Sequence, residues 1–114
     1  MEDYMQTQKY DGYIILTVRI EKKNDQYEAI CLELGVATFA DTFEEVIADI
    51  KEAILLQIET LTEVGELQNV LKEKNIPVSS RPQKEVRATI PVKDHTYISY
   101  EPHHISIPRQ HAHA

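Results

Sequence analysis

The chain has 114 residues, of which 42% are hydrophobic, and this suits a single domain with one modest core rather than disorder throughout. Its 19 Asp and Glu outnumber its 12 Lys and Arg, so the formal net charge is −7. The negative charge is concentrated in residues 1–79, and nucleic-acid binding by that part is disfavoured. No apolar run approaches the ~20 residues of a membrane span, and the acidic start Met1-Glu2-Asp3 predicts no signal peptide. A cytoplasmic protein is therefore expected.

Three strands are predicted in the first 40 residues. Residues 13–21 alternate between apolar and polar side chains, and one face carries Ile14, Leu16, Val18 and Ile20. The charged residues 22–26 form a turn, and residues 27–34 form a second strand that completes a hairpin. Gly35 interrupts this run, and residues 36–40 form a short third strand.

A long amphipathic helix is predicted from Thr42 to about Val64. Thr42 and Glu45 fit a capping box, in which the hydroxyl accepts the Glu45 amide and the carboxylate reaches back to the Thr42 amide, and Asp41 is the alternative cap. Leu55 and Leu56 widen the apolar stripe beyond one core face. Either the following segment wraps this end of the helix, or the two leucines contact another subunit or a partner.

The remainder of the chain is predicted to hold a short second helix, an edge strand and a tail. Residues 66–74 form the helix, and residues 85–92 form a strand that Pro91 places at a sheet edge. The runs 97–100 and 104–107 form a small hairpin around residues 101–103, or an extension that orders on a partner. The expected architecture is α+β, with a sheet of three to four antiparallel strands packed by one long helix over 1–93 and a His-rich C-terminal extension over 94–114.

Histidines are the only candidate ligands for a metal. All five lie in the last 20 residues, and an imidazole favours zinc or nickel, so the candidates are His103, His104, His111 and His113, with incidental exposed histidines as the alternative. The single cysteine, Cys31, lies in an apolar strand and is expected to be a packed thiol. We assign no catalytic residue and no cofactor, because the sequence has no Gly-rich phosphate loop, no Cys-x-x-Cys pair and no Gly-x-Ser-x-Gly elbow.

Several short motifs follow one another in a characteristic order, namely Tyr27-Glu28-Ala29, Leu34-Gly35, Ala40-Asp41-Thr42, Glu44-Glu45-Val46 and the strand over 85–92. In this order the chain resembles the HicB-like antitoxin family, small acidic domains that partner an RNA-cleaving toxin. The resemblance implies a partial ribonuclease-H-like sheet and a non-enzymatic role, in which an antitoxin or an orphan derivative neutralises a small basic toxin by protein–protein contact. No DNA-binding helix is readable after Val92, so DNA binding is not expected.

The resemblance implies that acidic side chains of the chain contact the toxin. They would cover the basic RNA-binding face of the toxin, and the candidate contacts are Glu28, Glu33, Glu44, Asp49 and Glu52. Leu55 and Leu56 are the candidate contacts of a homo-oligomer. The alternative is a small metal-binding or ribonuclease-like protein that uses the His-rich tail, where His95 resembles the catalytic histidine of HicA-like toxins. A regulatory module without a toxin is a third possibility.

Overall fold

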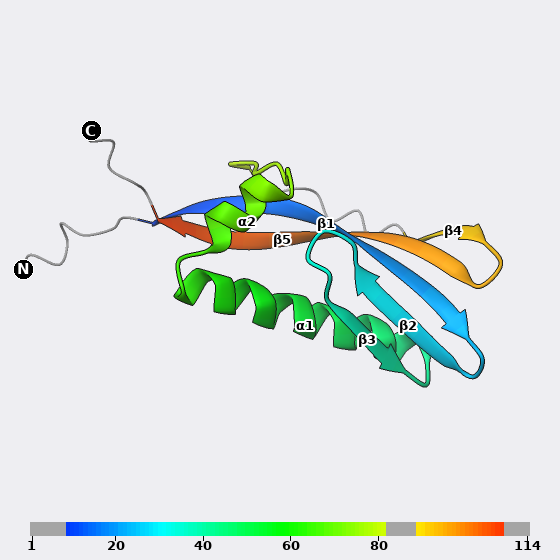
Figure 1. The fold of residues 1–114 in the computed structure, drawn as a ribbon. Helices are drawn as coiled ribbons and strands as arrows, with labels where there is room; N and C mark the ends of the chain where they lie inside the picture. The colour runs from blue at the N-terminus through cyan, green and yellow to red at the C-terminus, as the bar shows by residue number, and fades with distance from the viewer. Residues whose placement is uncertain (1–8, 82–88, 109–114) are drawn as a thin grey trace, which may run out of the picture.

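The fold is a five-stranded antiparallel sheet with two helices, and the computed structural model describes residues 9–81 and 89–108 (Figure 1). In chain order the elements are β1 (Lys9–Lys23), β2 (Gln26–Cys31), β3 (Ala37–Ala40), α1 (Phe43–Glu63), α2 (Leu67–Glu73), β4 (Thr89–Lys93) and β5 (Thr96–Pro108). The strands lie in the order β3-β2-β1-β5-β4. The predicted α+β class is confirmed, and the sheet has one strand more than the predicted maximum of four.

The N-terminal hairpin forms as predicted, with a tighter turn. Asn24 and Asp25 connect β1 to β2, and Asn24 has a φ of 57°, a left-handed conformation that asparagine tolerates better than most residues. β2 ends at Cys31, three residues earlier than predicted, because the chain turns back at Gly35. There the Gly35 amide donates to the Cys31 carbonyl at 2.8 Å, and Gly35 itself has a φ of 72°.

α1 begins with the predicted cap. The Glu45 amide donates to Thr42 Oγ1 at 3.1 Å, and the Thr42 hydroxyl donates to Glu45 Oε1 at 3.0 Å. The Glu45 carboxylate thus contacts the hydroxyl of Thr42 rather than the predicted Thr42 amide. The buried side chains of α1 recur every four residues, as one helix face requires, and they are Val46, Ile50, Ile54 and Ile58.

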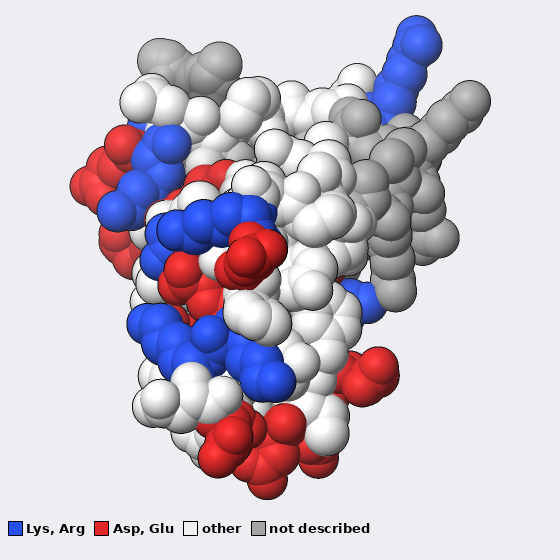
Figure 2. All heavy atoms as spheres, turned by 90° about the vertical axis from the view of Figure 1, so that its right-hand side faces the viewer, with Lys and Arg blue, Asp and Glu red and all other residues white. Residues whose placement is uncertain are grey.

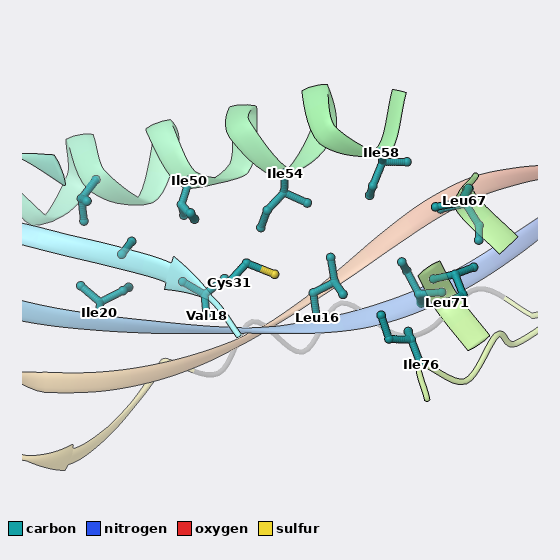
Figure 3. Close-up of a cluster of buried hydrophobic side chains, with 14 of the residues drawn as sticks. Leu16, Val18, Ile20, Cys31, Ile50, Ile54, Ile58, Leu67, Leu71 and Ile76 are labelled. Carbon is teal, nitrogen blue, oxygen red and sulfur yellow. The ribbon is translucent and has the colours of Figure 1, made fainter. Parts of the chain in front are cut away.

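The core lies between the helices and one face of the sheet. In β1 the predicted apolar face is confirmed, since Ile14, Leu16, Val18 and Ile20 are all buried. Figure 3 shows Ile50, Ile54 and Ile58 pointing from α1 toward this layer, with Leu67, Leu71 and Ile76 closing its far end. Gly12 belongs to the same face, where a Cβ would lie 2.7 Å from Ile107 Cδ1 and 2.9 Å from Val78 Cγ1. An alanine at this position would therefore have to displace these two side chains.

The predicted C-terminal hairpin around residues 101–103 is wrong. β5 continues through Pro102 and pairs with β1 from Lys9↔Pro108 to Glu21↔Thr96. The turn lies instead at Asp94-His95, so β4 and β5 form the hairpin. Residues 96–108, which the sequence assigned to an extension, are thus a strand inside the sheet. The proline is tolerated because β4 covers only residues 96–99 of β5, which leaves Pro102 beside a strand edge.

The edge position predicted for the strand that contains Pro91 is confirmed. β4 is the last strand of the sheet, and all five of its residues are exposed. Residues 85–88 of the predicted strand lie outside the described residues. The predicted short second helix is also confirmed as α2, with Leu67 and Leu71 buried.

Candidate partner-binding surface

The outward face of α1 is strongly acidic. Six exposed carboxylates lie on this helix, and they are Glu44, Glu45, Asp49, Glu52, Glu59 and Glu63. Lys51 is the only basic residue of α1, so the helix carries 6 negative and 1 positive charge, a net of −5. In Figure 2, which looks along the molecule from the end with the strand turns, acidic side chains gather at the bottom, and acidic and basic ones are intermixed above them. The charge of the molecule is thus unevenly distributed over its surface.

Two leucines interrupt the acidic face of α1. Leu55 and Leu56 are 51% and 57% exposed, and they lie between Glu52 and Glu59 at helical spacings of three and four residues. The following segment does not cover them, because α2 directs Leu67 and Leu71 into the core instead. The expectation that this segment wraps the helix end is therefore wrong. The expectation that the leucines contact another chain stays a prediction.

The five carboxylates singled out from the sequence do not form one surface. Glu44, Asp49 and Glu52 lie together on α1, whereas Glu28 and Glu33 lie elsewhere and already have partners. Glu28 lies 2.8 Å from Lys23 Nζ, and this hydrogen bond and charge raise the pKa of Lys23. In the strand register, Glu28 belongs to the sheet face opposite α1, because it pairs with Glu21.

Glu33 has a structural position that the sequence does not reveal. Its carboxylate accepts the Thr17 amide and the Thr17 hydroxyl, each at 2.8 Å. The Cys31 thiol also points to this carboxylate, at 3.8 Å, and burial raises the pKa of the thiol. β2 ends at Cys31, so Thr17 of β1 has no strand beside it on this edge. The Glu33 carboxylate accepts the hydrogen bond that a neighbouring strand would otherwise accept.

The two histidines His103 and His104 cannot coordinate the same metal ion, because neighbouring residues of a strand point to opposite faces of the sheet. His103 is buried beneath the helices, and its burial lowers its pKa, with Lys51 lowering it further and Glu101 raising it. His104 lies on the other face, with Nε2 2.7 Å from Asp11 Oδ1 and its ring against Tyr13. Among the described residues no group of three or more potential ligands could hold a metal, and His111 and His113 lie outside them.

β5 contains a row of buried polar residues that was not predicted from the sequence. Ser99, Glu101 and His103 alternate on the core side of the strand, and each is at least 91% buried. The Ser99 hydroxyl donates to Glu101 Oε2 at 3.2 Å, while His103 Nε2 has no hydrogen-bond partner among the described residues. Because the serine pairs with the carboxylate rather than with the imidazole, the row does not have the order of a nucleophilic triad. The period-2 pattern was visible in the sequence, but its polar members suggested a loop.

None of the helices in the described part of the chain is long and apolar enough to cross a membrane. No protein-family model, no curated protein and no solved structure matches the chain. The resemblance to HicB-like antitoxins therefore stays a prediction from the sequence motifs.

Proposed function

We propose that the chain is a cytoplasmic protein-binding module, a HicB-like antitoxin or an orphan derivative, that captures a small basic RNA-cleaving toxin through the outward face of α1. The observation that supports this proposal is the exposed pair Leu55 and Leu56 on a helix with a net charge of −5. Apolar contact supplies affinity, while the surrounding carboxylates select a basic partner and raise the rate of encounter.

The helix offers this surface in a preorganised form. The opposite side of α1 is anchored by Val46, Ile50, Ile54 and Ile58, so binding does not require the helix to fold first. Binding would block the basic RNA-binding face of the toxin by occupying it. The module acts by stoichiometric contact and has no catalytic step in this proposal.

A charge-reversal pair tests the proposed surface. The proposal predicts that a short basic protein is encoded beside this chain, and that protein is the probe, tested by pull-down, by titration calorimetry and by rescue of growth on co-expression. The double variant Asp49→Lys and Glu52→Lys should weaken binding at least 10-fold, because Glu52 lies one turn from both leucines and Asp49 lies on the same helix face as Leu56, two turns away. The matched control Glu66→Lys and Glu73→Lys changes the net charge equally, at exposed positions flanking or within α2.

Three results would contradict this proposal. They are equal loss of affinity in the two double variants, affinity that does not fall between low and high salt, or no binding to the adjacent gene product.

A further inference from the structure

No helix among the described residues packs on the sheet face opposite α1 and α2. We call it the open face. Its members follow from strand alternation and register, because paired residues share a face and neighbours along a strand do not. The apolar members are Tyr13, Ile15, Ile30, Phe39, Ile90, Ile98 and Tyr100. Four of them are substantially exposed: Ile15 by 43%, Phe39 by 58%, Ile90 by 45% and Tyr100 by 44%. Apolar side chains thus extend across all five strands.

Six charged side chains of the open face are paired within it. Three ion pairs are found among the described residues, namely Arg19–Glu21 at 3.8 Å, Lys23–Glu28 at 2.8 Å and His104–Asp11 at 2.7 Å. By strand alternation all six of these side chains belong to the open face. Apolar residues and mutually compensated charges therefore share this surface.

The open face is close to electrical neutrality, unlike α1. Among the described side chains it holds 3 basic residues, Arg19, Lys23 and Lys93, against the 3 carboxylates of Asp11, Glu21 and Glu28, which gives 0 with His104 neutral and +1 with His104 protonated. The helix α1 alone carries −5. Two copies of this acidic chain would repel each other if they met through α1, whereas they can meet through the open face with little repulsion.

We propose that the open face binds a second copy of this chain, forming a two-fold symmetric dimer. A self-complementary surface is what such an interface requires, since each residue set meets its own copy. The area is sufficient in order of magnitude. β1 and β5 pair over 13 positions, or about 44 Å at ~3.4 Å per residue, and a width of about 15 Å over neighbouring strands gives roughly 650 Å². A standard interface buries about 800 Å² on each partner.

One polar atom of the open face is also without a hydrogen bond. Arg19 lies between Ile30 and Ile98 in the register, near the middle of the sheet. Among the described residues its Nε has no hydrogen-bond partner, since Glu21 Oε1 at 3.8 Å is too far to accept one. The Arg19 side chain as a whole is 42% exposed, so its accessible N–H groups can donate to an acceptor of the second copy. In this dimer both α1 surfaces face outward, so Leu55 and Leu56 stay free for the proposed toxin and are not the homo-oligomer contacts that the sequence suggested.

Light scattering on the full chain after size exclusion tests the dimer, with variants on each face. Wild type should have twice the 13.2 kDa mass of one chain. Tyr100→Glu should raise the dimer dissociation constant at least 10-fold and yield monomer at micromolar concentration. The matched control Leu55→Glu adds the same charge at a residue of similar exposure on α1 and should leave the dimer intact. Circular dichroism verifies folding, and Tyr100→Ser and Leu55→Ser replace the pair if either Glu variant is unfolded.

Only dissociation by the Tyr100 variant with retention by the Leu55 variant supports the open face. A monomeric wild type, a dimer that survives the Tyr100 substitution, or dissociation by the Leu55 variant overturns the proposal. Salt separates this proposal from the toxin-binding one. Self-association through a neutral apolar face should persist at high salt, whereas capture of a basic partner by α1 should weaken.

Discussion

Replacing each of two neighbouring residues of α1 by alanine should lower stability to very different extents. Ile54 is fully buried in the core, whereas Leu55 is 51% exposed. Ile54→Ala removes three carbon atoms, worth about 2.4 kcal/mol at ~0.8 kcal/mol for each buried carbon. The unfilled cavity raises the expected loss of unfolding free energy to about 3–4 kcal/mol. Leu55→Ala should change the free energy of unfolding by less than about 1 kcal/mol, since substitutions at exposed positions have small effects.

Urea denaturation followed by circular dichroism measures this difference at one fixed protein concentration. With a denaturant slope of about 2 kcal/mol/M, the Ile54 variant should unfold at a midpoint lower by about 1.5–2 M, and the Leu55 variant within about 0.5 M of wild type. The reasoning would be refuted by equal midpoint shifts in the two variants. It would also be refuted by a larger shift for Leu55, which would show that the helix packs on the sheet through a different face.

Two further substitutions probe the sheet. Gly12→Ala should lower the free energy of unfolding by about 1–3 kcal/mol through overpacking, because the new Cβ would approach Ile107 Cδ1 to 2.7 Å. Thermal melts measure this loss, and an unchanged melting temperature would contradict the close approach. Burial lowers the pKa of His103 below the ordinary 6.5, so the unfolded chain takes up the proton at a higher pH than the folded chain. The free energy of unfolding therefore decreases as the pH is lowered from 6.5 to the folded-state pKa. Urea midpoints from pH 7.5 to 5 should therefore decline less in His103→Gln than in wild type, with the exposed His104→Gln as control. Parallel declines in all three proteins would exclude His103 as the cause.

The elements with a regular local pattern could be predicted from the sequence. The alternation from Ile14 to Ile20 and the four-residue spacing from Val46 to Ile58 follow from the backbone repeats of strand and helix, and the structure confirms both buried faces. The Thr42 cap and the edge position of Pro91 were equally readable, since a hydroxyl cap and a missing amide act on their own backbone neighbourhood.

Long-range pairing could not be read in the same way. β5 was mistaken for two short runs because Glu101, Pro102 and His103 interrupt its apolar residues. Only the tertiary structure shows that β1 extends to Lys9 and is paired with β5 along almost its whole length. The core face of β5 can hold polar residues because Ser99 and Glu101 satisfy each other there.

The candidate partner-binding surface was likewise predictable only in part from the sequence. The sequence by itself determined that α1 is amphipathic and acidic, because charge and period belong to the helix alone. The tertiary structure decided that Leu55 and Leu56 stay exposed, that Glu33 secures the edge of β1 and that His103 and His104 face opposite ways. Those outcomes depend on which elements reach a surface or an unpaired edge, and that is set by contacts between residues far apart in the chain.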